Sequence, residues 1–186
     1  MDSKPNYRDS IQVLEFAQHE QHRHFHNLTR IGRLLVTKKY SKDNAEMLKQ
    51  ARHYFEKGAL LRARDIEDSV MSRLLKAFAQ PKEPMHVEVL RLRQELNDMD
   101  EIYVRVGGLA GQLMDRIIQV GSDDPERLHP LLKTYRETVR HAWNAATEMM
   151  AREKTELFTL CAELFNGTAL AGIGKEMAGR RGHSFA

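Results

Sequence analysis

The sequence predicts an all-α protein folded as an up-down-up-down four-helix bundle. Apolar residues recur at intervals of three and four over almost the whole chain, which is the spacing of helices with one buried face. No long segment alternates apolar and polar residues, and the five prolines fall near expected helix ends. With 186 residues the chain is long enough for one compact domain. We therefore expect a single domain over residues 1–186, with the bundle at about 10–165 and a tail at 166–186.

The first two helices are delimited by capping residues and by proline. The first is expected over about residues 10–37, with Asp9 or Ser10 as the residue that caps its N-terminus. The link KKYSKD follows, and Ser41 or Asp43 can cap the second helix. The second helix is expected to end near residue 80, where the segment PKEP begins.

The third helix should begin around residues 83–86 and end near residue 120, and the fourth should end near residue 165. The turn GSDDPE separates them and supplies both caps and a proline suited to a first helical turn. Gly107 and Gly108 lie inside the third helix, where glycine costs about 1 kcal/mol relative to alanine. We therefore expect a kink, a local break or a close helix contact there. The tail should hold a short helix and end in a flexible terminus.

Composition restricts the class of protein. The formal net charge is +3, and the basic residues are mixed with acidic ones rather than gathered in one stripe, which argues against nucleic-acid binding. The N-terminus does not resemble a secretion signal, and no apolar run reaches the roughly 18 residues of a membrane span. The single cysteine, Cys161, cannot form an internal disulfide and is expected in the core. We expect a cytoplasmic protein that binds neither nucleic acid nor membrane.

Two predicted apolar rows carry a glutamate near their middle. Glu67 interrupts the row of the second helix and Glu153 that of the fourth, whereas the row of the third helix is apolar throughout. The three rows are Leu60, Ala63, Glu67, Met71, Leu74 and Phe78; Ala142, Ala146, Met149, Glu153, Leu157, Leu160 and Leu164; and Met85, Val89, Leu92, Leu96, Met99, Tyr103, Val106, Ala110, Leu113 and Ile117.

A buried carboxylate requires an ion pair, a metal or a proton, so the two glutamates are candidate metal ligands. The alternative is that a one-residue error in register places both at the edge of the seam. There they would stay hydrated and pair with neighbouring cations, for which the candidates are Arg62, Arg64, Arg152 and Lys154.

The first helix holds four histidines within eight residues, namely His19, His22, His24 and His26. One apolar row places His22 inward, and a competing row places His24 inward. His22 and His26 are four residues apart, a spacing at which two imidazoles can bind one divalent metal. The alternative is a solvated polar face with one histidine in the core.

Four segments together resemble the hemerythrin-like, cation-binding (HHE) four-helix bundles. Gln21-His22 is similar to the motif of the first helix, and ALLRARDIEDSVMSRLL, with Glu67, to that of the second. LRQELNDMDEIY, with Glu95, and MMAREKTELF, with Glu153, are similar to those of the third and fourth helices. The tail GKEMAGRRG is similar to a C-terminal stretch of bacterial members. The resemblance implies metal ligation by His22, Glu67 and Glu153, with His19, His24 and His26 as weaker candidates.

The chain departs from this family at its histidines. The positions where the family has histidine in helices two, three and four hold Ala63, Leu96 and Met149. The di-iron centre of the family uses imidazoles from all four helices together with bridging carboxylates. Alanine, leucine and methionine are side chains that a dry core selects, and the thioether of methionine is too soft for iron.

The leading interpretation is therefore a non-catalytic hemerythrin-like bundle with a degenerate metal centre, acting as a sensor, a regulatory protein or a partner-binding protein. We expect no catalytic residue and no cofactor, and the partner would be another protein or a second copy of the chain. The alternative is a working metalloprotein that binds iron, or zinc or manganese, through a reduced His/Glu site and responds to oxygen or nitric oxide. A third interpretation is a structural interaction protein that shares only the architecture.

Overall fold

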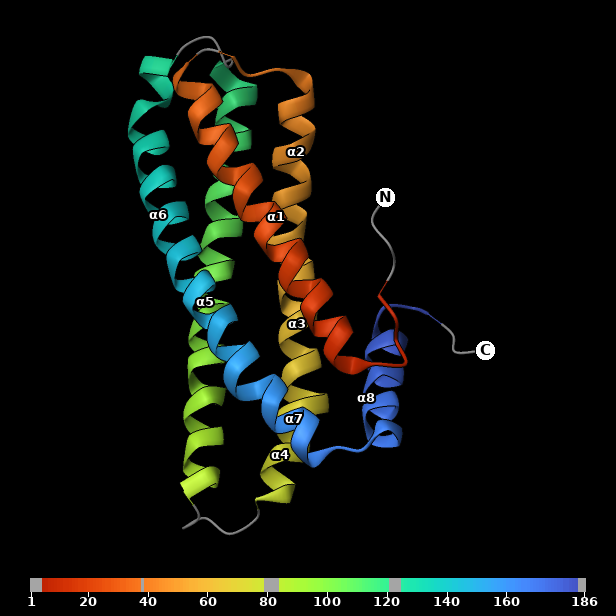
Figure 1. Cartoon of the computed structure of the whole chain (residues 1–186). Coiled ribbons are helices and arrows are strands. Elements are labelled where there is room, and N and C mark those ends of the chain that lie inside the picture. The colour runs from red at the N-terminus through yellow and green to blue at the C-terminus, as the bar shows by residue number, and fades with distance from the viewer. Residues whose placement is uncertain (1–4, 38, 79–83, 121–124, 184–186) are drawn as a thin grey trace. The chain divides into compact units, whose positions relative to one another are not determined.

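The computed structural model describes residues 5–37, 39–78, 84–120 and 125–183, and its course is traced in Figure 1. Within these ranges the chain forms helices joined by short links, with no strand, so the predicted all-α class is confirmed. The elements are α1 (Ser10–Val36), α2 (Lys42–His53), η1 (Tyr54–Gly58), α3 (Ala59–Arg64), η2 (Asp65–Met71), α4 (Ser72–Ala77), α5 (Pro84–Val120), α6 (Pro125–Arg152), η3 (Glu153–Leu157), α7 (Phe158–Leu164) and α8 (Gly167–Arg180). No helix in the described ranges is long and apolar enough to cross a membrane.

The predicted helix limits agree with these elements to within a few residues. The first helix ends one residue early, and the third begins at Pro84, within the predicted start at residues 83–86. The second runs continuously from α2 to α4, and its predicted end near residue 80 lies outside the described residues. The tail holds α8, which is capped by Asn166 through a 2.9 Å hydrogen bond from the backbone N–H of Ala169. The last three residues of the predicted flexible terminus lie outside the described ranges.

Three π-helical turns, η1, η2 and η3, interrupt the second and fourth helices of the prediction. A π turn adds a residue to the helical turn, so the side chains beyond it point in directions that a constant helical period does not give. The predicted row of the second helix is accordingly wrong in its first half, where Leu60 is 40% exposed and Glu67 is only partly covered, whereas Met71 and Leu74 are buried as predicted. Arg62 and Ile66 are buried instead.

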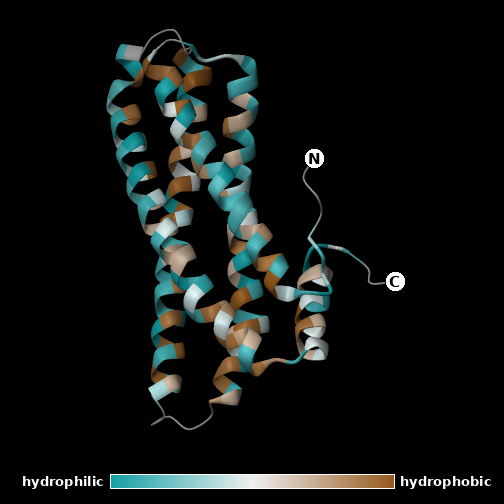
Figure 2. Cartoon of the chain, in the orientation of Figure 1, coloured by the Kyte–Doolittle hydropathy of each residue, from teal (hydrophilic) through white to brown (hydrophobic). Residues whose placement is uncertain are grey.

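The other two predicted rows hold over most of their length. In α5 the residues from Val89 to Leu113 are buried as predicted, although Met85 is exposed. The row of the fourth helix holds to Leu157, but beyond η3 the buried position is taken by Cys161 rather than by Leu160. Figure 2 shows hydrophobic residues recurring along the helices between hydrophilic ones.

The chain divides into two compact units. Unit 1 comprises Met1–His19, Leu61–Asp98 and Glu148–Ala186, and unit 2 comprises Glu20–Leu60 and Met99–Thr147. The core of unit 2 is aromatic: the Phe25 ring lies 4.8 Å from that of Phe55 and 6.4 Å from that of Trp143. The core of unit 1 is mainly aliphatic, with Phe158 as a buried aromatic residue, and it includes the C-terminal helix, from which Ile173 and Met177 are fully buried.

The two glycines inside α5 differ in their surroundings. The helix continues through both without a break. A Cβ atom on Gly107 would lie 3.3 Å from the Cβ of Phe55, so this glycine permits a close approach of α5 and η1. Gly108 has no neighbour within 4 Å of such an atom. The sequence predicts a kink, a local break or a close helix contact at these two glycines, and the close helix contact is confirmed at Gly107.

Candidate functional site

The centre of unit 1 holds a buried ion pair between Arg62 and Glu153. Nη2 of Arg62 donates a hydrogen bond to each of the two carboxylate oxygens of Glu153. The two side chains are 5% and 1% exposed, respectively. Gln18 of α1 completes the group, since its Nε2 donates to Oε2 of Glu153 at 2.5 Å and to the carbonyl oxygen of Met150 at 3.3 Å. A positive charge from the chain itself therefore neutralises the buried carboxylate.

Local helix geometry accounts for this arrangement. Arg62 lies in the short α3 segment between η1 and η2, and Glu153 is the first residue of η3. The wide turns on either side of α3 leave position 62, rather than position 63, on the buried face. Arginine suits that position because its planar guanidinium is always charged and matches the geometry of a carboxylate.

Glu67, the second predicted carboxylate ligand, lies at the surface of unit 1. Nε of Arg93 donates to Oε2 of Glu67 at 2.9 Å, and a second contact joins Nη2 to Oε1. The side chains of Arg93 and Glu67 are 40% and 35% exposed. The alternative that a carboxylate lies at the edge of the seam and pairs with an arginine thus describes Glu67. Glu153 is also paired with an arginine, but it is buried.

Of the four clustered histidines, His24 alone is buried. Its ring stacks on Tyr54 at 4.5 Å, and burial lowers the pKa of its imidazole to about 4, with a smaller contribution from Arg23. His22 is exposed, so the prediction that places His22 inward is wrong and the competing prediction, which places His24 inward, is confirmed. The rings of His22 and His26 meet that of Trp143 edge-on at 5.5 and 6.3 Å. His19 is exposed as well, so the cluster is largely a polar face next to an aromatic residue.

The residues present do not fit the iron centre that the family resemblance implies. Leu96 and Met149 are buried apolar side chains at two of the positions where the family has histidine, and the third holds Ala63. Glu153 is occupied by a guanidinium, which carries a permanent charge and leaves no oxygen free of that contact. Among the described residues, no three His, Cys, Asp or Glu side chains are grouped so that they could hold a metal ion.

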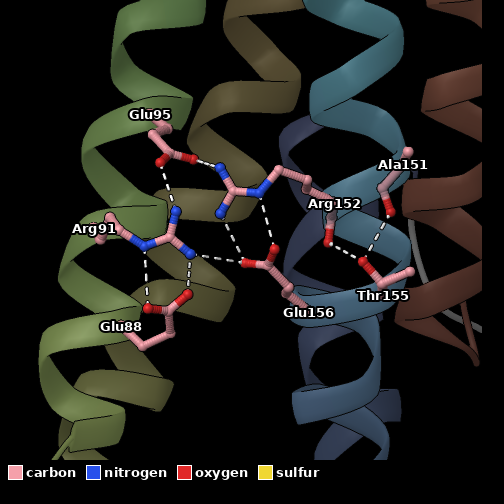
Figure 3. Close-up of polar contacts among 7 residues, drawn as sticks. All are labelled: Glu88, Arg91, Glu95, Ala151, Arg152, Thr155 and Glu156. Atoms are coloured by element: carbon pink, nitrogen blue, oxygen red, sulfur yellow. Dashed lines mark hydrogen bonds and ion pairs between the residues drawn. The ribbon is translucent and has the colours of Figure 1, made fainter.

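Glu95, the glutamate that the sequence resemblance pairs with the third-helix motif, belongs to a partly exposed network in unit 1, drawn in Figure 3. Arg91 donates to it at 2.7 Å, and Arg152 contacts its other oxygen. Both arginines also bind Glu156, and Arg91 pairs with Glu88 as well. These hydrogen bonds lower the pKa of the carboxyl groups of Glu156 and Glu88. Every carboxylate of this network has an arginine partner, so none serves as a free ligand.

A second buried carboxylate, Asp65 in η2, was not recognised in the sequence. Nη1 of Arg180 donates to its Oδ1 at 2.9 Å, and Arg181 contacts its Oδ2. Burial raises the pKa of the Asp65 carboxyl, and the two arginines oppose that effect. The Arg-Arg pair in the tail looks like a basic terminus in the sequence. One signal in the sequence could have identified these two arginines as partners of a carboxylate: they lie at the end of a short helix with an N-terminal cap.

No protein-family model, no curated protein and no solved structure matches this chain in the comparisons made with each.

Proposed function

We propose that this protein is a non-catalytic hemerythrin-like four-helix bundle in which an arginine–glutamate pair takes the place of a metal centre. In this proposal its helices follow one another in an up-down-up-down arrangement, and it acts as a sensor, a regulatory protein or a partner-binding protein. The observation that carries the proposal is the contact of the Arg62 guanidinium with both oxygens of the buried Glu153 carboxylate.

The argument rests on charge. A buried carboxylate needs a compensating cation, because an unpaired charge in a protein interior costs several kcal/mol. A divalent metal supplies that cation in a metalloprotein, and here a side chain supplies it. Arginine keeps its proton at all ordinary pH values and offers no vacant coordination position, so it replaces the charge of a metal without its chemistry.

The remaining reactive groups also favour a non-catalytic role. Burial raises the pKa of the Cys161 thiol to about 12, so at neutral pH the sulfur is not a nucleophilic thiolate. The buried imidazole of His24 is neutral at pH 7 and stacks on Tyr54. A role that depends on the surface, such as binding a partner, needs neither group.

The test is elemental analysis of tag-free protein expressed with iron, zinc and manganese supplied. The proposal predicts much less than one metal per chain in the wild type and in two variants, Glu153→Gln and Glu67→Gln. About one or two metals per chain in the wild type, lost in Glu153→Gln, would refute the proposal and establish the metalloprotein alternative. Metal retained in Glu153→Gln but lost in His22→Ala would also refute it, by placing a site on the first helix.

A further inference from the structure

A groove with a volume of about 550 Å³ is lined entirely by residues of α1 and α6 in unit 2. Its apolar wall includes the buried side chains of Leu28, Leu132 and Val139. Trp143, the only tryptophan in the chain, forms part of the lining and is half-buried. The groove therefore combines an apolar surface with a large aromatic ring.

The polar lining of this groove is strongly basic. Arg33 of α1 and Lys133, Arg136 and Arg140 of α6 contribute four cations, against one acidic residue, Glu137. In the described part of the chain none of these four cations takes part in an ion pair. By contrast, in the network of Figure 3 Arg91 binds three carboxylates and Arg152 binds two.

The spacing of these cations has a cost. Lys133, Arg136 and Arg140 follow one another at intervals of three and four residues and so lie on one face of α6. Like charges at such intervals repel and destabilise a helix. A bound anion would relieve this repulsion.

The position of Arg136 is set by a glycine on α1. A Cβ atom on Gly32 would lie only 3.0 Å from Cγ of Arg136, so the arginine stem passes directly over the helix at the one residue without a side chain. Thr29, in the wall of the groove, has a buried hydroxyl with no hydrogen-bond partner in the described part of the chain. Buried polar groups of this kind are usually satisfied by a neighbour, an ordered water or a ligand.

The size of the groove favours a small molecule. Pockets for small ligands typically have volumes of about 300–1,000 Å³ and are lined by apolar side chains with a few polar groups. A stable protein partner would instead need roughly 800 Å² on each side.

We propose that this groove binds a small organic anion, whose carboxylate or phosphate head group lies among Arg33, Arg136 and Arg140 and whose apolar body packs against Leu132 and Trp143. This site is separate from the Arg62–Glu153 pair, and the proposal does not depend on whether the protein binds metal.

The probe is 1-anilinonaphthalene-8-sulfonate, an aromatic anion, and binding is followed by its own fluorescence and by quenching of Trp143. Because the chain has one tryptophan, quenching reports on this groove directly. N-phenyl-1-naphthylamine serves as the uncharged analogue. Displacement by decanoate, decyl phosphate and decanol then separates the two head groups from each other and from the apolar chain.

Two double variants provide the comparison. Arg136→Gln with Arg140→Gln removes two groove cations, and Lys57→Gln with Arg105→Gln removes two exposed cations of unit 2 outside the groove. We expect saturable 1:1 binding of the sulfonate that quenches Trp143 and weakens at least about tenfold in the first double variant, since each lost contact is a charge-assisted hydrogen bond. The second double variant should bind within about twofold of the wild type.

Displacement by decanoate or decyl phosphate, but not by decanol, would support the proposal and name the preferred head group. Equal binding of the sulfonate to both double variants would overturn the proposal, because the dye would then lie elsewhere. Absence of Trp143 quenching up to millimolar probe would overturn it as well. Equal affinity for the charged and uncharged dyes would overturn the assignment of an anion.

Discussion

Removing one member of the Arg62–Glu153 pair should destabilise the protein much more than removing both. The two side chains are 5% and 1% exposed, so a single substitution leaves a charge in an environment that water barely reaches. Breaking a buried pair by removal of one partner costs about 3–5 kcal/mol. We therefore expect Arg62→Met and Glu153→Leu each to lower the free energy of unfolding by roughly that amount.

The double variant, Arg62→Met with Glu153→Leu, should behave differently. It removes both charges together with the cost of dehydrating them, and it leaves side chains that fill the space with apolar atoms. Replacing a buried ion pair by hydrophobic residues of similar volume is often neutral or stabilising by about 1–4 kcal/mol. The amide of Gln18 then loses its carboxylate partner, and an unsatisfied buried polar group costs about 1–3 kcal/mol. The net change should therefore lie within about 2 kcal/mol of the wild type.

The assay is urea unfolding followed by circular dichroism, with the interaction energy taken from the double-mutant cycle. The pair Arg93–Glu67 is a matched control with the same two residue types at 40% and 35% exposure. A cycle of Arg93→Met and Glu67→Leu should give an interaction energy of about 0–1 kcal/mol, against roughly 3 kcal/mol or more for the buried pair. Equal interaction energies in the two cycles would refute the reasoning, because burial would then not determine the strength of the pair.

Three further predictions concern single residues. Gly174→Ala should lower the free energy of unfolding by about 1–3 kcal/mol, since its Cβ would lie 2.1 Å from the backbone oxygen of Tyr7. Gly172→Ala places its new atom in open space and should raise the free energy of unfolding by up to about 1 kcal/mol. Urea unfolding measures both changes. The folded pKa of His24, about 4, lies below its unfolded value of 6.5, so the unfolded state binds more protons between these pH values and stability falls as the pH is lowered through that window. The loss should be about 3 kcal/mol between pH 7 and pH 4, and a His24→Phe variant measured at both pH values should lose correspondingly less. Cys161, buried and with a thiol pKa of about 12, should not react with iodoacetamide at pH 8 until urea unfolds the chain; rapid alkylation of the native protein would contradict its placement in the core.

The helices could be predicted because their signals are local. Capping residues such as Ser41, and the prolines near the helix ends, act within a few residues of the position they mark. In α5, where no π turn intervenes, the buried row could also be predicted from Val89 to Leu113. The period of a regular helix is enough for such a segment.

The candidate site could be predicted only in part, because the π turns change the period. Glu153 was found because its row is regular up to η3, which begins at that residue. Glu67 was misplaced because it lies within η2, and Arg62 was overlooked as a central residue because arginine is rarely buried. The sequence names Arg62 as one candidate cation among several at the edge of the seam, and only the packing of segments distant in the sequence shows it buried against Glu153, 91 positions away.

The fixed charge of Arg62 also explains how the Glu153 carboxylate can lie in a buried row. If Glu153 were retained for metal binding, its counter-charge would have to leave when the metal arrived, and a buried guanidinium has no route to lose its charge. Metal binding would therefore require Arg62 to move away from Glu153. Breaking this buried ion pair costs about 3–5 kcal/mol. Glu67 and Glu153, which resemble family ligands, thus each have a structural role as the partner of an arginine. The groove of unit 2 presents the opposite case, since its four cations have no partner within the described chain, and it is there that a function dependent on binding is best sought.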